Sequence, residues 1–296
     1  MNRRMFGKLA AAAFAPGVRV YADKTKIISR IEGVTIGAQT YSFRDRPLDA
    51  CIAAMKEIGL GEAELYNGHI EPKGKDELAA WRKNPPLDEM RAVRRKFDDA
   101  GINLYALNYS FREEWGEPEL EAGFAIAKAM GVKYITASSN VSTAKRIAPL
   151  AEKYRIVVAF HNHSNMAPNE FARPQDFEQA MSASPKWIGI NLDIGHFTAA
   201  GYDAVAYIKQ HHARITNLHL KDRKKSSDFN ADRTAIPLNN FPWGQGDTPI
   251  KAVLQLVSQE KYTFPADIEY EYECRAAGTP VEEIAKCLAF AKNCLT

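Results

Sequence analysis

The sequence lacks several features that would place it in a specialised class of protein. No apolar run among its 296 residues is long enough to span a bilayer, so we expect no stable membrane insertion. Cys51, Cys274, Cys287 and Cys294 form no CxxC pair, which excludes a zinc ribbon and a thioredoxin-type motif. The net charge is only +3 and the basic residues are scattered, which argues against nucleic acid as a partner. The remaining composition is that of an ordinary globular α/β protein.

The N-terminus differs in character from the rest of the chain. The pair Arg3-Arg4 precedes a short small-residue stretch and then Val20-Tyr21-Ala22, which suits a signal peptidase. This segment resembles a twin-arginine export signal, and it predicts a periplasmic or otherwise exported protein. If it is only a frayed basic terminus, the protein is cytoplasmic. In chain order the predicted parts are an export leader at 1–22, a linker at 23–33 and one folded domain at 34–296.

The folded domain alternates short apolar runs with segments of helical periodicity. Gly59 and Gly131 each mark the expected end of a helix. The polar composition of residues 68–86 predicts a loop insertion. A doubly wound sheet would usually show a GxGxxG turn after the first strand, and the chain has none. Eight strand-then-helix units in this length predict a (β/α)8 barrel. The predicted strands are 35–43, 63–66, 102–107, 134–137, 156–160, 188–192, 215–220 and 266–270.

Four successive strands end in residues that can bind a metal ion. They are His161, Asp193, His219 and Glu269, and each has the strand parity that points to the barrel mouth. If only one of them were present, it would be interpreted as a buried structural residue rather than as a metal ligand. Because all four recur in register at one rim, we predict a single divalent metal site. Two imidazoles and two carboxylates suit Mn²⁺ first, then Co²⁺ or Zn²⁺, and Mg²⁺ less well.

The same strand ends carry a set of short motifs. With them, the chain resembles the xylose isomerase-like TIM barrels, a family of sugar phosphate isomerases and epimerases, over roughly residues 33–295. The resemblance implies metal ligation by the end of the fifth strand, Asp193, His219 and Glu269, and substrate contact by His196. The family's epimerases usually have Glu where this chain has His161, which departs from their mechanism with two carboxylate bases. The motifs are AELY at 63–66, NH at 162–163, DIGH at 193–196, HLKD at 219–222, WGQG at 243–246 and IEYE at 268–271.

Further side chains near the rim are candidates for catalysis and substrate binding. Glu269 is the predicted general base, and Lys221 and His196 are predicted donors to an oxyanion. Each reading has a plainer alternative: a solvated rim lysine for Lys221, a salt bridge for Glu64 and loop packing for Trp243. The predicted substrate-binding residues are His163, Glu64 and Trp243.

These residues predict a metal-dependent isomerase or epimerase acting on a carbohydrate that is not phosphorylated. A metal would polarise the carbonyl and stabilise the enediolate formed when the α-proton is removed. The alternative is a 3-keto-glycoside lyase or hydrolase that eliminates a β-leaving group. Less favoured are an endonuclease IV-like phosphodiesterase, which needs further histidines on the second and third strands, and a sugar-binding protein without turnover. A homo-oligomer is compatible with the sequence.

Overall fold

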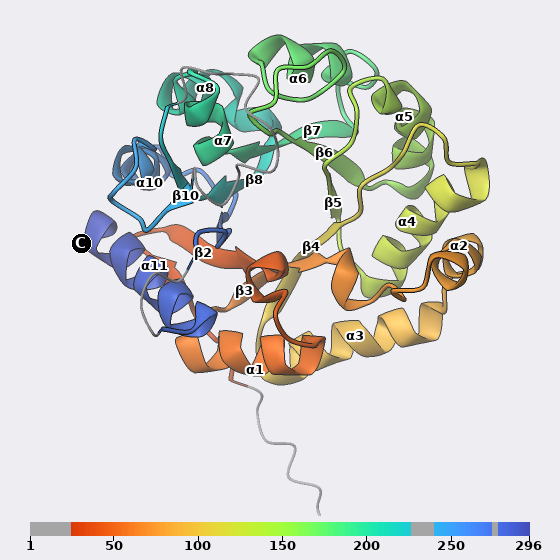
Figure 1. Cartoon of the computed structure of the whole chain (residues 1–296), viewed down its shortest axis with the longest axis horizontal. Coiled ribbons are helices and arrows are strands. Elements are labelled where there is room, and N and C mark those ends of the chain that lie inside the picture. The colour runs from red at the N-terminus through yellow and green to blue at the C-terminus, as the bar shows by residue number, and fades with distance from the viewer. Residues whose placement is uncertain (1–24, 226–239, 274–277) are drawn as a thin grey trace, which may run out of the picture.

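Eight parallel strands close into a barrel at the centre of the molecule (Figure 1). The computed structural model describes residues 25–225, 240–273 and 278–296. Neighbouring strands follow chain order, and the circle closes through pairing of β2 with both β3 and β11. The predicted (β/α)8 barrel is therefore confirmed. The barrel strands are β2 (Val34–Gln39), β3 (Glu62–Tyr66), β4 (Asn103–Asn108), β5 (Tyr134–Ala137), β6 (Val157–His161), β7 (Ile188–Asp193), β8 (Ile215–Leu220) and β11 (Ala266–Ile268).

Helices form a ring around the barrel (Figure 1). All residues of β7 and β8 are buried, as expected of strands covered on both faces. Gly59 and Gly131 end α1 and α4 with φ of 87° and 69°, a backbone region that favours glycine. The helices are α1 (Leu48–Ile58), α2 (Lys75–Lys83), α3 (Leu87–Ala100), α4 (Glu117–Met130), α5 (Thr143–Tyr154), α6 (Pro174–Met181), α7 (Ile194–Ala199), α8 (Ala204–His211), α10 (Ile250–Gln259) and α11 (Pro280–Leu295), with short 3₁₀ helices η1 (Thr40–Phe43), η2 (Asn67–His69) and η3 (His212–Arg214).

Several predicted elements differ from those in the structure. The first strand ends at Gln39 because its side chain accepts from the Tyr41 N–H and starts η1. The stretch predicted as a loop, residues 68–86, contains η2 in part and all of α2. A further helix, α7, begins directly after β7, since the Asp193 carboxylate caps it by accepting from the His196 N–H.

The segment before β2 packs on the barrel. β1 (Arg30–Ile31) pairs antiparallel with β2, and the Ile27 N–H donates to the Gly101 carbonyl at 2.9 Å. The Ser29 hydroxyl donates to the Ile36 carbonyl at 2.6 Å. Residues 25–33, predicted as a linker, are thus attached to the fold. The predicted leader, residues 1–22, lies outside the described residues.

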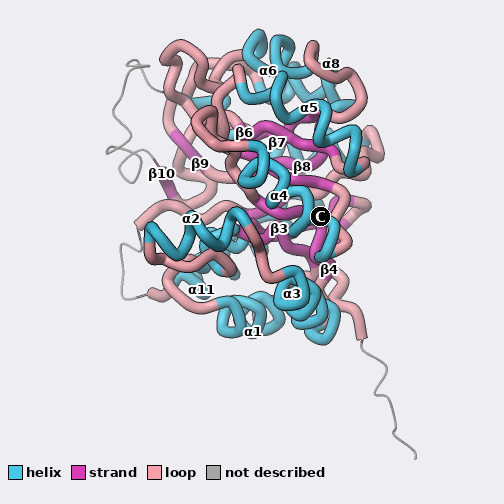
Figure 2. The backbone as a smooth tube through the Cα atoms, turned by 90° about the vertical axis from the view of Figure 1, so that its right-hand side faces the viewer, coloured by secondary structure: helices cyan, strands magenta, loops and turns pink. Residues whose placement is uncertain are grey.

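The carboxyl ends of the strands all open at one end of the barrel. There, β9 (Asp222–Arg223) and β10 (Asn240–Phe241) pair beyond the ends of β6, β7 and β8 (Figure 2). Within the described ranges, no helix is both long and apolar enough to cross a bilayer. The fold therefore brings every strand end to one rim, where the predicted site residues meet.

Candidate active site

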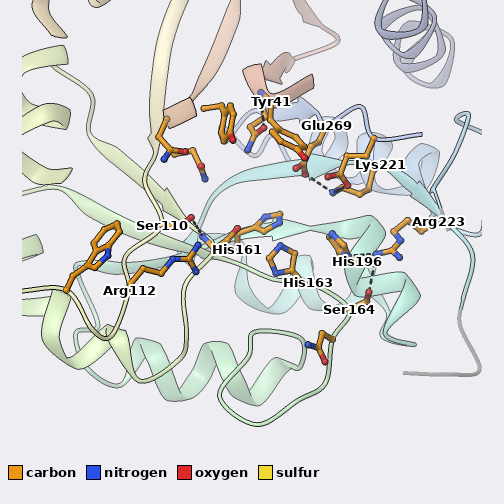
Figure 3. Close-up of a pocket in the computed structure, with 18 of the residues that line it drawn as sticks. Tyr41, Ser110, Arg112, His161, His163, Ser164, His196, Lys221, Arg223 and Glu269 are labelled. Carbon is orange, nitrogen blue, oxygen red and sulfur yellow. Dashed lines mark hydrogen bonds and ion pairs between the residues drawn. The ribbon is translucent and has the colours of Figure 1, made fainter. Parts of the chain in front are cut away.

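A cavity of about 610 Å³ occupies the carboxyl-terminal mouth of the barrel (Figure 3). His161, His163 and His196 stand side by side in it, with Lys221 and Glu269 across from them (Figure 3). The cavity is large enough for a small organic ligand, since ligand pockets hold roughly 300–1,000 Å³. Its other lining residues are Gln39, Tyr41, Tyr66, Asn67, Arg82, Asn108, Ser110, Arg112, Glu114, Trp115, Ser138, Ser164, Asn165, Arg223 and Glu271.

The fold brings the four predicted metal ligands to one point. His161 and Asp193 are the last residues of β6 and β7, His219 lies one residue before the end of β8, and Glu269 directly follows β11. One ligand atom from each lies within 4.8 Å of those of the other three, and all four residues are buried. Adjacent strands β6, β7, β8 and β11 supply them in order. The arrangement fits a divalent ion with nitrogen and oxygen ligands.

Neighbouring side chains determine which nitrogen each imidazole presents. His161 Nδ1 lies 2.9 Å from Asn191 Oδ1, and His219 Nε2 lies 2.8 Å from Glu64 Oε2. Because both oxygens can only accept, these nitrogens carry the protons. The lone pairs of His161 Nε2 and His219 Nδ1 then face the ligand cluster. A partner of this kind behind each histidine is typical of metal sites.

Three buried ligand atoms have no hydrogen-bond partner among the described groups. They are Asp193 Oδ2, His219 Nδ1 and Glu269 Oε2. The last two lie 2.9 Å apart, within ion-pair distance but without hydrogen-bond geometry. The Lys221 ammonium lies 3.0 Å from Glu269 Oε2, but His219 Nδ1 gains a partner at this point only from a proton on the ring or from a divalent ion. The residues present therefore fit a metal ion.

Lys221 contributes a fixed positive charge beside this cluster. Its Nζ lies 3.0 Å from Asp193 Oδ2, 3.0 Å from Glu269 Oε2 and 2.6 Å from Glu271 Oε2. Burial opposes the charge, but the three carboxylates outweigh it and raise the pKa of Lys221. The side chain is thus a protonated donor rather than a base.

The two carboxylates of the cluster differ in electrostatic environment. Burial raises the pKa of Asp193 to about 7, against the opposing charge of Lys221. Burial also acts on Glu269, but Lys221 and His219 outweigh it and hold the pKa of Glu269 well below its usual range. Glu269 is therefore ionised and able to accept a proton.

His196 is held as a neutral donor toward the cavity. Its Nδ1 accepts from the Arg223 guanidinium, which also donates to Ser164 at 3.1 Å. Burial, and then the charges of Lys221 and Arg223, hold the pKa of His196 well below its usual range. The neutral ring therefore carries its proton on Nε2.

A second histidine group lies beside the four-residue cluster. His161, His163 and His196 also offer nitrogens within 4.8 Å of one another. No carboxylate belongs to this group, and Arg223 occupies His196 Nδ1. A divalent cation therefore fits the four-residue cluster better.

Two of the predicted substrate-binding residues lie elsewhere. Glu64 is fully buried and is not among the cavity-lining residues. Its oxygens accept from Thr136 at 2.6 Å, Asn217 at 2.8 Å and the metal-ligand candidate His219. The Trp243 ring packs edge-on against Phe290, 6.0 Å between centroids, and likewise does not line the cavity. His163 does line it.

Sequence reasoning missed several side chains at the site. Asn191 shares its parity with Asp193 two residues on, which was the available signal for its contact with His161. Glu271 follows Glu269 by the same spacing and pairs with Lys221. No sequence pattern indicated that Arg223 contacts His196, because this contact depends on β9 turning back over α7.

The comparison that decides the family covers most of the chain. The family described as Xylose isomerase-like TIM barrel matches residues 52–294. The chain belongs to this family. An inosose isomerase from Halalkalibacterium halodurans is 24% identical over 240 residues, covering 73% of this chain and 82% of that protein.

Solved structures show the same xylose isomerase-like fold. The IOLI protein, crystallised with a bound zinc atom, has a TM-score of 0.66 and 19% identity, covering 88% of this chain and 99% of that one. A probable 3-DHS dehydratase, AsbF, from Bacillus anthracis has a TM-score of 0.66 and 15% identity, covering 86% and 98%. At these identities the likeness concerns the barrel itself.

Proposed function

We propose that this protein is a metal-dependent carbohydrate enzyme that removes the proton α to a carbonyl of a keto-sugar. The observation that carries the proposal is the buried cluster of His161, Asp193, His219 and Glu269 at the mouth. A cationic donor and a neutral imidazole donor stand beside it, at Lys221 and His196. The inosose isomerase relative supports a carbohydrate substrate.

A bound divalent ion would polarise the carbonyl and stabilise the negative charge that develops as the α-proton leaves. Mn²⁺ remains our first choice, and zinc in the IOLI structure supports a transition metal over Mg²⁺. His161 and His219 present one lone pair each because Asn191 and Glu64 hold their other nitrogens.

The protein's own residues divide the acid–base work. Glu269, ionised and buried, accepts the α-proton. Lys221, 3.0 Å from Glu269, and the Nε2–H of His196 donate to the sugar oxygens. His163, beside both His161 and His196, contacts a substrate hydroxyl.

The fate of the enediolate separates two reactions. Reprotonation gives an isomerase or epimerase, which is our first proposal. Departure of a β-leaving group, with a proton from the Lys221 ammonium, gives a lyase acting on a 3-keto-glycoside. The second candidate is favoured by His161, because the family's epimerases, which the chain resembles, usually have a glutamate base at this position. An inosose dehydratase from Lactiplantibacillus plantarum, 28% identical over 79 residues (27% of this chain and 26% of that protein), is consistent with it.

The reacting sugar is proposed to carry no phosphate. Lys224 and Lys225 form a close basic pair after β8. Lys224 Nζ donates to Asp247 at 3.1 Å, and the Lys225 N–H donates to the same carboxylate at 2.9 Å. Asp247 thus already accepts from both residues, which leaves this loop poorly suited to a phosphate.

The deciding assay incubates the metal-loaded enzyme with ketoses and with 3-keto-glycosides in deuterated water. Deuterium at the α-carbon of an intact sugar supports reprotonation, whereas release of the aglycone with an unsaturated keto-sugar supports elimination. Glu269→Gln should lower the rate by about 10²–10⁴-fold, the usual contribution of a general base. Glu260→Gln, at the exposed end of α10, is the matched control.

Two outcomes would contradict the proposal. A sugar that binds without exchanging its α-proton would indicate a binding protein. Cleavage of abasic DNA without proton exchange would indicate an endonuclease IV-like enzyme. The end of β4 argues against the latter, because Asn108, Tyr109 and Ser110 include no histidine that could hold further metal ions.

A further inference from the structure

The cavity has a second wall that the proposed chemistry does not use. It consists of Tyr66, Arg82, Arg112 and Trp115, which we call the outer wall. Tyr66 is the last residue of β3, Arg82 lies on α2 after that strand, and Arg112 and Trp115 follow β4. In the closed barrel, β3 lies four strands from β7 and β4 lies four strands from β8. The outer wall therefore stands across the mouth from the Asp193 and His219 side.

Internal contacts hold the outer wall in place. Arg82, on α2, forms two parallel hydrogen bonds with Glu71 at 3.0 and 2.9 Å, and its guanidinium lies 4.4 Å from the centroid of the Trp115 ring. Arg146 donates to the Glu113 and Trp115 carbonyls at 2.5 and 2.8 Å. Arg82 and Trp115 are therefore held in position before a ligand binds, which reduces the entropy lost on binding, whereas the Arg112 side chain is exposed.

Arg112 differs from its neighbours in having no acidic partner. Among the described residues, no carboxylate lies within ion-pair distance of its guanidinium, whereas Arg82 is paired with Glu71. Figure 3 shows the Arg112 side chain reaching toward His161 and His163 inside the cavity. A guanidinium directed into a ligand pocket in this way matches a planar anion such as a carboxylate.

The volume of the cavity also supports a second binding region. About 610 Å³ is available, and the proposed chemistry needs only one sugar ring in front of Glu269. The half-buried rings of Tyr66 and Trp115 offer flat apolar surface for the face of another ring.

We propose that the outer wall is a second subsite, which binds an unreacted ring bearing a carboxylate. Tyr66 and Trp115 contact the ring, and Arg112 pairs with its carboxylate. The substrate would then be a glycoside whose second ring is either a benzoate-type aglycone or a uronic acid residue. This rests on the proposed function only in placing the reacting sugar beside Glu269.

The first test compares 3-keto-glucosides that differ only in the second ring. The 4-carboxyphenyl compound should be turned over with kcat/KM about tenfold above that of the neutral 4-carbamoylphenyl isostere, the scale of one charge-assisted contact. Arg112→Gln should abolish that preference chiefly through KM, so that the carboxyl and carbamoyl compounds are turned over with equal kcat/KM. Arg95→Gln, exposed on α3, is the control. A disaccharide ending in glucuronate, against its glucose counterpart, tests the uronic acid source.

The second test measures binding without turnover. The unoxidised 4-carboxyphenyl and 4-carbamoylphenyl glucosides are titrated while tryptophan fluorescence is followed, and Trp115→Phe should remove most of the response. The carboxylate should bind about tenfold more tightly, and only when Arg112 is present. Equal affinities in the unchanged protein, or a preference that survives Arg112→Gln, would overturn the subsite. Binding preference without α-proton exchange would keep the subsite and reject the proposed reaction.

Discussion

At His219, the two ring nitrogens have different roles. Nε2 donates to Glu64 and Nδ1 faces Glu269 and the ligand cluster. Strand parity predicted that the ring enters the barrel mouth, but not which nitrogen would be presented. The hydrogen bond from the ring decides this, and Glu64 lies 155 positions away in the chain. The same holds for His161 and its partner Asn191.

Removing a ligand side chain should empty the metal site. We expect about one transition-metal equivalent per chain in the isolated protein, and loss of most of it in Asp193→Ala or His219→Ala, because each supplies one of the four buried ligand atoms. Metal analysis after gel filtration measures this, with circular dichroism to confirm folding. Asp203→Ala, at the exposed cap of α8, should retain the metal. Full occupancy in both ligand variants would disprove the assignment.

Replacing Glu64 separates its two candidate roles. Glu64→Gln keeps the size of the side chain but removes the charge that orients His219, so metal affinity should fall about 10–100-fold. A chelator competition titration measures it, with Glu57→Gln on the exposed face of α1 as control. If Glu64 binds substrate instead, as its sequence position suggested, metal affinity will be unchanged and KM will rise.

At the scale of elements, the barrel tolerates little added volume at Gly37 on β2. A Cβ there would lie 2.2 Å from Asp267 Oδ1 and 3.3 Å from the Glu62 Cβ. Gly37→Ala should therefore push apart β2 and β11, which pair at this position. Overpacking of this kind costs about 1–3 kcal/mol.

The measurement is the thermal midpoint, which should fall by at least about 2–4 °C. Gly74→Ala is the control, because its Cβ would meet only ordinary contacts at 3.4 Å or more. An unchanged midpoint for Gly37→Ala would show that Asp267 moves aside without cost.

Two helices were not predicted from the sequence, for different reasons. α2 is polar overall and buries none of its residues, so its sequence did not stand out from that of a polar loop. α7 is only six residues long and starts at the Asp193 cap, so its pattern could not be separated from the preceding strand. Both matter for the site: α2 supplies Arg82 to the outer wall, and α7 carries His196.

At the scale of the whole molecule, the leader remains a prediction. If residues 1–22 direct export, replacing Arg3 and Arg4 by lysine should trap the full-length precursor in the cytoplasm. Cell fractionation with N-terminal sequencing measures both location and cleavage near Ala22. The unchanged chain found only in the cytoplasm and at full length would reject the export reading.

The sequence alone determined the barrel and the four candidate ligands. Both can be recognised from short stretches of sequence. Strand and helix periodicities repeat along the chain, and each of the four ligands lies at a strand end: His161, Asp193, His219 and Glu269. In a parallel barrel every such end comes to the same rim. The family motifs lie at these positions too.

Only the tertiary structure decided how those ligands are supported and what faces them. Glu64 reaches His219 and Asn217 across the barrel interior, and Arg112 and Trp115 enter the cavity from the far side of the mouth. These contacts join residues widely separated in sequence, and the partner depends on which strands close the barrel. Periodicity fixes the direction of a side chain from its own strand, but the group that it meets is set by closure of the sheet.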